Sequence, residues 1–453
     1  MRFRSSAFPV LLALAFLAGS CGTDGTKSTQ VGTDGTGATQ VTVEEPPTTD
    51  APGFVPSTLP PPTQETFGVE LVANVTERNR SPGANGDAVN DVVAGTNDFA
   101  IRFFKAAIGD GSDNVVIGNY SLGTALLLTM AGTRGVTNDE FGVLLGVDAV
   151  APGELHAAVN AIDLILEGRA GHGLDISTAN KLFVQDGLQL RNDFLDLAVG
   201  SYGAPVAAVD FVSAPDDVVS AVNGWVSEQT DGMIKELTTG YSPDTVIVLA
   251  NATYMKASWA VQFQRRDKPG EFTTADGTVV LAELMAHDEY LPMNQGSDFV
   301  AVELPYVGGN LSLVIVQPDD LASFEADLSA DHLRQITDGL KQSGIHLTLP
   351  IWSTETHIEA LDPLLTIGLP ATYDFGAMFE GGDNGYFIDS ISHVARIDVD
   401  ETGTSAAAAT DVAIAGSHGP TVTINQPFFY FIRDRGSEAI LFMGHVTDPT
   451  QPN

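Results

Sequence analysis

Apolar positions recur with two different periods along the chain, and they predict helices first and strands later. In residues 97–107, 122–131 and 155–166 the apolar residues are spaced by three and four, which is the repeat of one face of a helix. Later segments alternate or run apolar with β-branched residues, which is typical of strands. Because no regular strand–helix–strand rhythm joins the two kinds of segment, we expect an α+β fold. The predicted strands are 245–249, 311–317, 346–350, 421–424, 428–433 and 439–443.

The N-terminal end departs from this pattern and predicts an export signal. Arg2 and Arg4 precede an apolar run at 10–17, which is too short to span a bilayer and ends in Leu-Ala-Gly-Ser-Cys. This end resembles the lipobox of bacterial lipoproteins, although Ala18 stands where leucine is commonest. We therefore expect a signal peptide at 1–20 and an exported protein that is anchored to the outer face of the cell membrane through a lipid on Cys21.

A tether and a single large domain follow the predicted signal. Residues 21–66 are rich in Gly, Thr, Pro and Asp and contain a duplication, GTDGTKSTQ at 22–30 and GTDGTGATQ at 32–40. Such a segment has little to bury, so we expect a solvated spacer. Residues 67–450 have a globular composition without a second linker of this kind. Since Cys21 is the only cysteine, no disulfide is expected, and core packing must stabilise the domain.

Charge and histidine placement exclude several function classes. The chain has 21 Lys and Arg against 58 Asp and Glu, a formal net charge of −37. Such an acidic chain repels phosphate backbones, so we expect no nucleic-acid partner, and membrane contact only through the lipid anchor. The nine histidines are scattered without an HExxH pattern, and no glycine-rich phosphate loop precedes a helix. We therefore expect neither a metal nor a cofactor.

The segment ETGTSAAAATDVAIAGSHGP at 401–420 has the residue pattern of neither a buried core element nor an ordinary turn. Its alanines favour helix, but poor helix formers flank them and Pro420 ends the segment. Read with a period of two, one face from Thr404 to Ile414 is small or apolar, so a buried strand is possible. Alanine is also a weak strand former. A segment that can form a buried strand, but has little intrinsic tendency to do so, suits a change of conformation. An exposed Ala/Thr loop is the alternative.

Five spaced motifs in order resemble the serpin family. The first is the family's hinge, Glu-x-Gly-Thr/Ser followed by small residues and Thr. The other segments are TANKLFVQDGLQL at 178–190, VNGWVSEQTDGMIKEL at 222–237, LANATYMKASWAVQF at 249–263, and the closing pair INQPFFYFIRD and ILFMGHVTDP at 424–434 and 440–449. The resemblance covers residues 97–449. The hinge residues are Glu401, Gly403, Thr404, Ala406, Ala407, Ala408, Ala409 and Thr410.

The resemblance implies the serpin fold, with about nine helices around three β-sheets and an exposed reactive loop near the C-terminus. It implies a monomeric inhibitor of extracellular serine proteases rather than an enzyme. The target protease would cleave the loop, remain attached to it in a covalent complex, and be trapped as the loop inserts into the central sheet. The inward hinge positions carry no bulky or charged residue, which favours an inhibitory member of the family.

The family spacing also implies where the protease cleaves. Counting from Glu401 places the reactive bond at Ser417–His418, and counting back from Pro427 places it at Gly416–Ser417. Between residues 410 and 423 there is no Lys, Arg or aromatic residue to fill a trypsin-like or chymotrypsin-like pocket. We therefore expect an elastase-like or subtilisin-like target.

Four further residues resemble the positions that control opening of the family's central sheet. Ser121, Asn251 and His393 correspond to the shutter, and Trp259 corresponds to the tryptophan where the loop first enters the sheet. Gly118 stands where the family usually has a serine. The lysine that usually pairs with the hinge glutamate is not found in residues 358–369.

Two other functions remain as alternatives. A non-inhibitory serpin would use the same fold as a binding module. A serine hydrolase would use Ser121 as its nucleophile, because Asn119-Tyr120-Ser121-Leu122-Gly123 approaches the Gly-x-Ser-x-Gly turn. Asn119 replaces the first glycine of that turn, where a small residue is needed for steric reasons.

Overall fold

The computed structural model describes residues 68–451, except 72, 172–173, 383–384, 389 and 405–418. Two units are distinguished, 1–63 and 64–453, and the fold described here is that of the second. The predicted lipidation residue Cys21, the hinge residues Ala406, Ala407, Ala408, Ala409 and Thr410, and the reactive-bond candidates Gly416, Ser417 and His418 lie outside the described residues.

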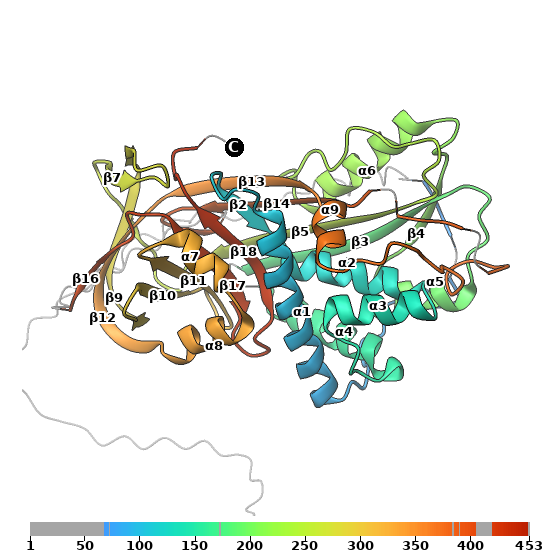
Figure 1. Ribbon diagram of the computed structural model, residues 1–453, viewed down its shortest axis with the longest axis horizontal. Helices are drawn as coiled ribbons and strands as arrows, with labels where there is room; N and C mark the ends of the chain where they lie inside the picture. The colour runs from blue at the N-terminus through green and yellow to red at the C-terminus, as the bar shows by residue number, and fades with distance from the viewer. Residues whose placement is uncertain are drawn as a thin grey trace, which may run out of the picture. The chain divides into compact units, whose positions relative to one another are not determined.

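A seven-stranded sheet forms one half of the domain (Figure 1). Within it β3 and β4 are parallel, whereas every other neighbouring pair is antiparallel. Its strand order is β1 (Val69–Glu70), β4 (Val206–Val209), β3 (Leu174–Gln185), β5 (Ile247–Ser258), β15 (Gly403–Thr404), β14 (Ser392–Val399) and β13 (Trp352–Glu359).

A nine-stranded sheet forms the other half, and a two-stranded hairpin accompanies it (Figure 1). The hairpin pairs β7 (Gly270–Thr273) with β8 (Val279–Ala282). In the nine-stranded sheet the order is β16 (Thr421–Thr423), β12 (Lys341–Pro350), β9 (Leu284–Gln295), β10 (Phe299–Pro305), β11 (Leu311–Pro318), β17 (Phe428–Asp434), β18 (Ile440–Val446) and β2 (Val115–Ile117), with β6 (Gln264–Arg265) beside β9.

Nine helices occur in the described part of the chain, which with the three sheets confirms the predicted α+β class. The predicted helices at 97–107, 122–131 and 155–166 lie within α1, α2 and α4. The helices are α1 (Gly86–Ala107), α2 (Asn119–Ala131), α3 (Val136–Leu145), α4 (Pro152–Glu167), α5 (Asn192–Tyr202), α6 (Pro215–Gln229), α7 (Leu321–Ala326), α8 (Ala330–Asp338) and α9 (Leu361–Thr366). Among these helices, none is both long and apolar enough to cross a membrane.

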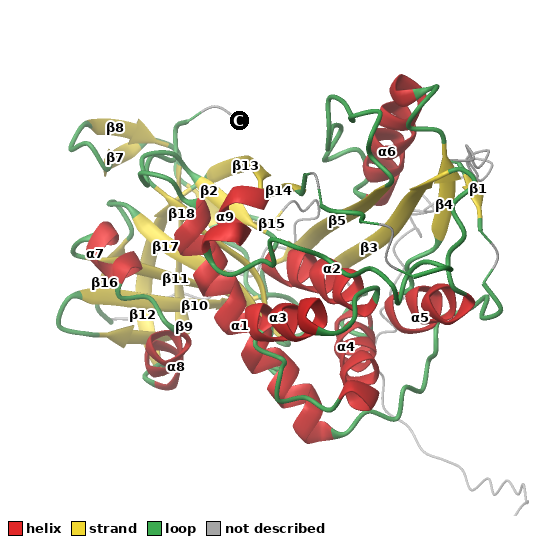
Figure 2. Ribbon diagram, turned by 45° about the vertical axis from the view of Figure 1, so that its right-hand side comes forward, coloured by secondary structure: helices red, strands yellow, loops and turns green. Residues whose placement is uncertain are grey.

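Strand β3 of the seven-stranded sheet is covered on both faces, and the alternation of its side chains shows why. Leu182 and Val184 point into the core that α2 shares, whereas Phe183 points to the opposite face, where Trp225 of α6 packs on it with ring centroids 6.3 Å apart. Figure 2 shows α6 on one side of the sheet and α2 to α5 on the other. At residues 182–184 β3 is therefore apolar on both faces, whereas the border strand β13 carries exposed polar side chains such as His357.

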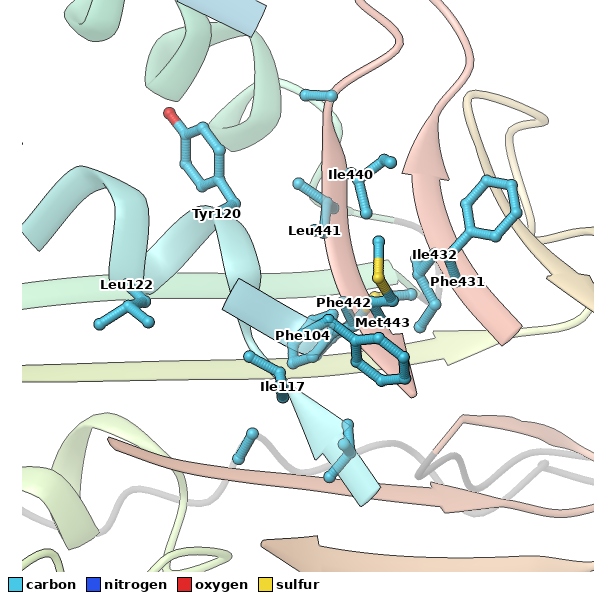
Figure 3. Packing of buried hydrophobic residues seen from close by; sticks show 14 of the residues in the cluster. Phe104, Ile117, Tyr120, Leu122, Phe431, Ile432, Ile440, Leu441, Phe442 and Met443 are labelled. Atoms are coloured by element: carbon cyan, nitrogen blue, oxygen red, sulfur yellow. The ribbon is translucent and has the colours of Figure 1, made fainter. Parts of the chain in front are cut away.

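Helices α1 and α2 join the two sheets through one apolar core. Phe104 of α1 belongs to this core together with Ile432 of β17 and Met443 of β18 (Figure 3). Nearly all side chains of α2 are buried, as expected for a helix that is apolar all round. Its first residue, Asn119, follows directly after β2 and Gly118, so the start of α2 is fixed at the seam between the sheets.

The segment before α1 is bound to the domain by a buried ion pair. Arg78 Nη2 donates to Asp163 Oδ2 at 2.5 Å, and the side chains are 16% and 6% exposed. The Tyr120 hydroxyl of α2 donates to the other oxygen of the same carboxylate. Burial raises the pKa of Asp163, while the Arg78 charge opposes that shift. The carboxylate therefore depends on Arg78 for its ionised state.

Replacing Arg78 with methionine should lower the free energy of unfolding by about 3–5 kcal/mol, because a buried carboxylate loses its partner. Arg80→Met is the matched control. Arg80 pairs with Glu167 on the surface, where the side chains are 64% and 50% exposed, so its loss should cost at most about 1 kcal/mol. Urea unfolding of both variants measures the difference, and equal midpoints would contradict the prediction.

Candidate functional site

The hinge residues Gly403 and Thr404 form β15, a strand placed between β5 and β14. Gly403 pairs with Ser258, Thr404 pairs with Ala257, and Val399 of β14 pairs with Thr404. Below this point no register joins β5 directly to β14 within the described residues. At this upper end the two strands are one strand position apart, and the hinge occupies that position; elsewhere β5 and β14 approach each other more closely than two strand spacings.

A close backbone approach requires glycine at position 403. Its φ is +154°, and a Cβ added there would lie 2.0 Å from the carbonyl oxygen of Ala257 and 2.7 Å from the Cα of Ser258. Both atoms belong to the backbone of a central strand, so neither can move aside cheaply. Any other residue would therefore displace the hinge from β5.

A tight turn returns the chain from β14 into the hinge. Asp400 Oδ1 accepts hydrogen bonds from the Thr402 amide at 2.7 Å, the Thr402 hydroxyl at 2.6 Å and the Gly403 amide at 3.1 Å. The indole Nε1 of Trp259 donates to the Asp400 carbonyl at 2.8 Å. The Trp259 amide donates to the Thr402 carbonyl at 3.1 Å. Trp259 therefore holds this turn from the end of β5, where the family resemblance expects the loop to enter.

The Thr404 side chain points into a closed aromatic corner. Its hydroxyl lies 2.8 Å from the Tyr306 hydroxyl, and only 2% of the residue is exposed. The Tyr306 ring stacks on Trp259 with centroids 4.7 Å apart and planes 8° apart. Burial raises the pKa of Tyr306, so its hydroxyl stays protonated and can form this hydrogen bond. A small polar side chain fits here, and a long charged one would not.

Arg265 pairs with the hinge glutamate and was missed by sequence reasoning. Its Nη1 lies 3.6 Å from Glu401 Oε2, and it also pairs with Glu283. The Phe263 amide donates to the Glu401 carbonyl at 2.9 Å. Glu401 Oε2 is buried without a hydrogen-bond partner in the described part of the chain, so the Arg265 charge is what compensates it. No local signal singles out Arg265, because β6 reaches Glu401 only through the fold.

One half of the predicted shutter consists of linked side chains on three elements. The Ser121 hydroxyl of α2 donates to Asn251 Oδ1 of β5. Asn251 Nδ2 in turn donates to Asn180 Oδ1 of β3 at 2.6 Å. Asn180 was not among the predicted site residues, although the motif at 178–190 contains it; its register partner across the sheet is Asn251. These contacts fix β5 to the start of α2.

The other half of the predicted shutter lies on β14. His393 is 4% exposed, and its Nε2 accepts a hydrogen bond from the Gly118 amide at 3.0 Å. Burial lowers the pKa of His393 to about 4, so the ring is neutral at pH 7 and Nε2 can accept. Ser121 in the first turn of α2 is therefore bonded to β5 through Asn251, and Gly118, the residue before α2, is bonded to β14 through His393. In this way β5 and β14 are each bound to one helix end.

This geometry does not support a Ser121 nucleophile. Ser121 is 1% exposed, and its hydroxyl donates to Asn251. The Nε2 of His393, which would have to act as the base, is occupied by the Gly118 amide. A metal-assisted route finds no support either, since no cluster of three or more His, Cys, Asp or Glu side chains suited to a metal occurs in residues 68–451 where they are described.

A cavity lies along the lower part of the seam between β5 and β14. Its volume is about 160 Å³. Leu249 and Asn251 line it from β5, His393 lines it from β14, and Leu122 and Leu126 line it from α2. It borders the lower end of β5 at Ile247 to Asn251, and Gly403 and Thr404 do not line it.

Comparison with known proteins agrees with this architecture. The family model for serpins, described as serine protease inhibitors, matches residues 94–449. A serpin-like protein of Thermococcus kodakarensis is 31% identical over 374 residues, which are 79% of this chain and 86% of the relative. A leukocyte elastase inhibitor of Xenopus tropicalis is 30% identical over 366 residues, 77% of this chain and 96% of the relative. Human thyroxine-binding globulin in complex with its ligand superposes with a TM-score of 0.73 at 24% identity, covering 80% of this chain and 100% of that structure.

The chain therefore belongs to the serpin family, which is described as a family of serine protease inhibitors. The predicted serpin fold is confirmed. The globulin likeness concerns the fold alone.

A double-mutant cycle should detect the pairing of Arg265 with Glu401. We expect a coupling of about 0.2–1 kcal/mol between Arg265→Met and Glu401→Gln, small because Arg265 is 49% exposed. Arg266→Met, the exposed neighbour, should show no coupling with Glu401→Gln. Thermal unfolding of the four proteins in each cycle provides the measurement, and equal coupling for both arginines would argue against the pairing.

Acid should weaken the folded state through His393. Its pKa is about 4 when folded and about 6.5 when unfolded, so the unfolded chain binds the extra proton between these values. The free energy of unfolding should therefore fall by up to about 3 kcal/mol from this residue as pH drops from 6.5 to 4.

Urea unfolding at pH 7 and pH 4.5 tests this. Burial also lowers the pKa of His156 and His287 to about 4, so the wild type loses stability from three histidines. His393→Gln should show a smaller loss than the wild type, whereas the exposed control His357→Gln should match it. A loss in His393→Gln as large as in the wild type would refute the assignment.

Proposed function

We propose that this serpin inhibits extracellular serine proteases as a suicide substrate. The hinge carries the proposal: Gly403 and Thr404 already lie as the first two residues of a strand between β5 and β14. The cavity below them supports the same function, because it lies on the path that further residues of the loop would follow. Relatives named elastase inhibitors add support at the level of the family.

The chemistry is that of an interrupted proteolysis. The hydroxyl of the protease serine attacks the carbonyl carbon of Ser417, and its proton passes to the nitrogen of His418 as the Ser417–His418 bond breaks. The new amine leaves with residues 418–453, and Ser417 remains attached to the protease as an ester. With the bond at Gly416–Ser417, the same step leaves Gly416 as the ester. Hydrolysis of this ester competes with insertion of the loop, and insertion traps the protease.

The strand register along β5 and the free energy of backbone hydrogen bonding are both compatible with insertion of the loop as a strand. Extending the Gly403–Ser258 pairing along β5 would bring Ile414 opposite Ile247, the first residue of that strand. Ten residues, 405 to 414, would then join the sheet. At about 1 kcal/mol net for each backbone hydrogen bond, the gain is on the order of 10 kcal/mol. This is comparable with a typical domain stability of about 5–15 kcal/mol, so it can drive displacement of the bound protease.

The loop composition supports an elastase-like or subtilisin-like target. Ser417, or Gly416 in the alternative register, offers only a small side chain to the primary pocket of the protease. For the cellular setting we propose export and lipidation at Cys21, supported by the apolar run at 10–17 and the lipobox-like end. The inhibitor would then act at the outer surface of its own cell.

Incubation with an elastase-like, a subtilisin-like and a trypsin-like protease tests the proposal. We expect a complex that survives denaturing electrophoresis with one of the first two proteases. Thr404→Arg should convert the protein to a cleaved substrate, because the arginine cannot enter the corner beside Tyr306 and Trp259. Thr278→Arg, an exposed position in the turn between β7 and β8, should leave complex formation unchanged.

The proposal would be contradicted if every protease tried cleaved near residue 417 without forming a complex. That result would favour a non-inhibitory binding module. Thermal unfolding of the cleaved wild type supplies a second measurement. Insertion should raise the unfolding temperature of the cleaved form above that of the intact form, and cleaved Thr404→Arg should show a smaller rise.

A further inference from the structure

The cavity beside the lower end of β5 has walls from both faces of the seven-stranded sheet. Leu122 and Leu126 of α2 belong to the core on one face, whereas Leu237, in the segment after α6, belongs to the core on the other. Figure 2 shows α2 and α6 on these opposite sides of the sheet. The cavity is therefore bordered by the sheet, by α2 and by the segment that joins α6 to β5.

The walls of this cavity are mostly apolar, and they include aromatic rings. Phe375, Met378 and Phe379 line it from the segment before β14, and each is at most 4% exposed. The Phe379 ring packs on Tyr386, with centroids 4.6 Å apart. An apolar cavity of about 150 Å³ can hold a benzene ring, and the volume here is about 160 Å³. A single ring or a compact hydrocarbon of that size therefore fits.

A polar recess of about 420 Å³ adjoins the cavity. The two spaces share several lining residues, among them Leu237, Tyr241 and His393. Hydroxyl groups dominate the polar side chains of the recess. They belong to Thr238, Thr239, Ser242, Thr245, Ser390 and Ser392. A molecule whose apolar part fills the cavity can therefore extend a polar end into the recess.

Tyr241 stands at the border of the two spaces. Its ring packs edge-on against Phe211, with centroids 5.4 Å apart and planes at 86°. Burial raises the pKa of Tyr241, so its hydroxyl stays protonated and neutral. Tyr241 therefore offers an apolar wall and an uncharged polar group where the cavity meets the recess.

The charge around the two spaces is negative. Asp244 lines the cavity, and Glu236 and Glu359 line the recess. Among the described residues that line either space there is no lysine or arginine. A carboxylate in the recess would be repelled by these side chains, whereas an ammonium group would be attracted.

The two histidines at this place do not reverse that charge. His393 lines both spaces and is neutral at pH 7, because burial lowers its pKa to about 4. His357 lines the recess, but its Nε2 lies 2.8 Å from Glu355 Oε1, which offsets any positive charge on the ring. Charge complementarity therefore favours a ligand with a cationic end.

We propose that the cavity and the recess together form a binding site for a small apolar amine. A ring or compact hydrocarbon of about the size of benzene would lie in the cavity, and a short chain would carry an ammonium group into the recess. Neither space is lined by the hinge residues Gly403 and Thr404. Binding of the amine needs no protease, so the inference stands apart from the proposed function.

Calorimetric titration of the intact protein with three probes of one shape tests the proposal. The probes are phenylpropylamine, phenylpropanol and phenylpropanoate, which share the ring and chain and differ in the charge of the polar end. We expect the amine to bind most tightly and the alcohol about fivefold more weakly, because it lacks the attraction of an exposed ion pair. The carboxylate should bind more weakly still, and propylamine, which has no ring, should not bind.

Two variants locate the bound amine. Ala125 of α2 lines the cavity and is 6% exposed, so Ala125→Leu fills part of the space, and leucine is a good helix former. This variant should bind the amine at least tenfold more weakly. Its matched control, Ala106→Leu in α1, lines neither space and should bind as the wild type does.

The charge of the recess is tested by the double variant Glu236→Gln with Asp244→Asn. It should weaken binding of the amine by about fivefold and leave binding of phenylpropanol unchanged. Glu271→Gln, which removes an exposed charge on β7, should change neither affinity.

Several results would overturn the proposal. Binding of none of the three phenyl probes would refute the site, and equal affinities for the amine and the carboxylate would refute its charge preference. Unchanged amine binding by a folded Ala125→Leu would show that the ring binds elsewhere. If that variant does not fold, ethylbenzene replaces it as the test, because it should compete with the amine for the wild-type cavity. Absence of competition at saturating ethylbenzene would then refute the placement of the ring.

Discussion

The narrow strand position between the upper ends of β5 and β14 is the constraint on which the rest of this serpin depends. Two central strands offer an incoming strand backbone partners on both sides, but only if the side chains of that strand are small enough for the space around it. Gly403 and Thr404 meet this condition at the upper end, because Gly403 lies against the backbone of Ala257 and Thr404 fits beside Tyr306. The sequence that follows is rich in alanine, so its side chains are also small.

Helix α2 connects the two sides of this seam. Its first turn bonds β5 through Ser121 and Asn251, and the amide of Gly118, the residue before it, bonds β14 through His393. Movement of either strand must therefore break a buried hydrogen bond at the same helix end. The neutral state of His393 is part of this arrangement, since a protonated ring could not accept from the Gly118 amide. A single buried residue thus makes the stability of the seam sensitive to acid.

Periodicity predicted α1, α2 and α4 and six of the strands, because these depend on local side-chain alternation, and the family resemblance of the motifs predicted the hinge. They did not predict Arg265 as the partner of Glu401, since Arg265 reaches it only because the segment after β5 folds along the hinge turn, where the Phe263 amide donates to the Glu401 carbonyl. Asn180 was missed for a similar reason: its role follows from its register opposite Asn251. The segment from Gly68 to Arg80 carries little apolar periodicity, and it is attached by polar contacts: the pairing of β1 with β4 and the buried ion pair of Arg78 with Asp163 of α4.

Strand β1 has a consequence for how this sheet can grow. The exposed edge of a sheet is a template for pairing with another chain, and proteins commonly cover it. Val69 and Glu70 occupy the edge of β4, whose own residues are therefore not open to a further strand at those positions. Addition of a strand is thereby discouraged at this border, because the new edge strand has only two residues. A short N-terminal strand outside the residues matched by the family model thus helps to keep lateral association with other copies from competing with insertion of the molecule's own loop.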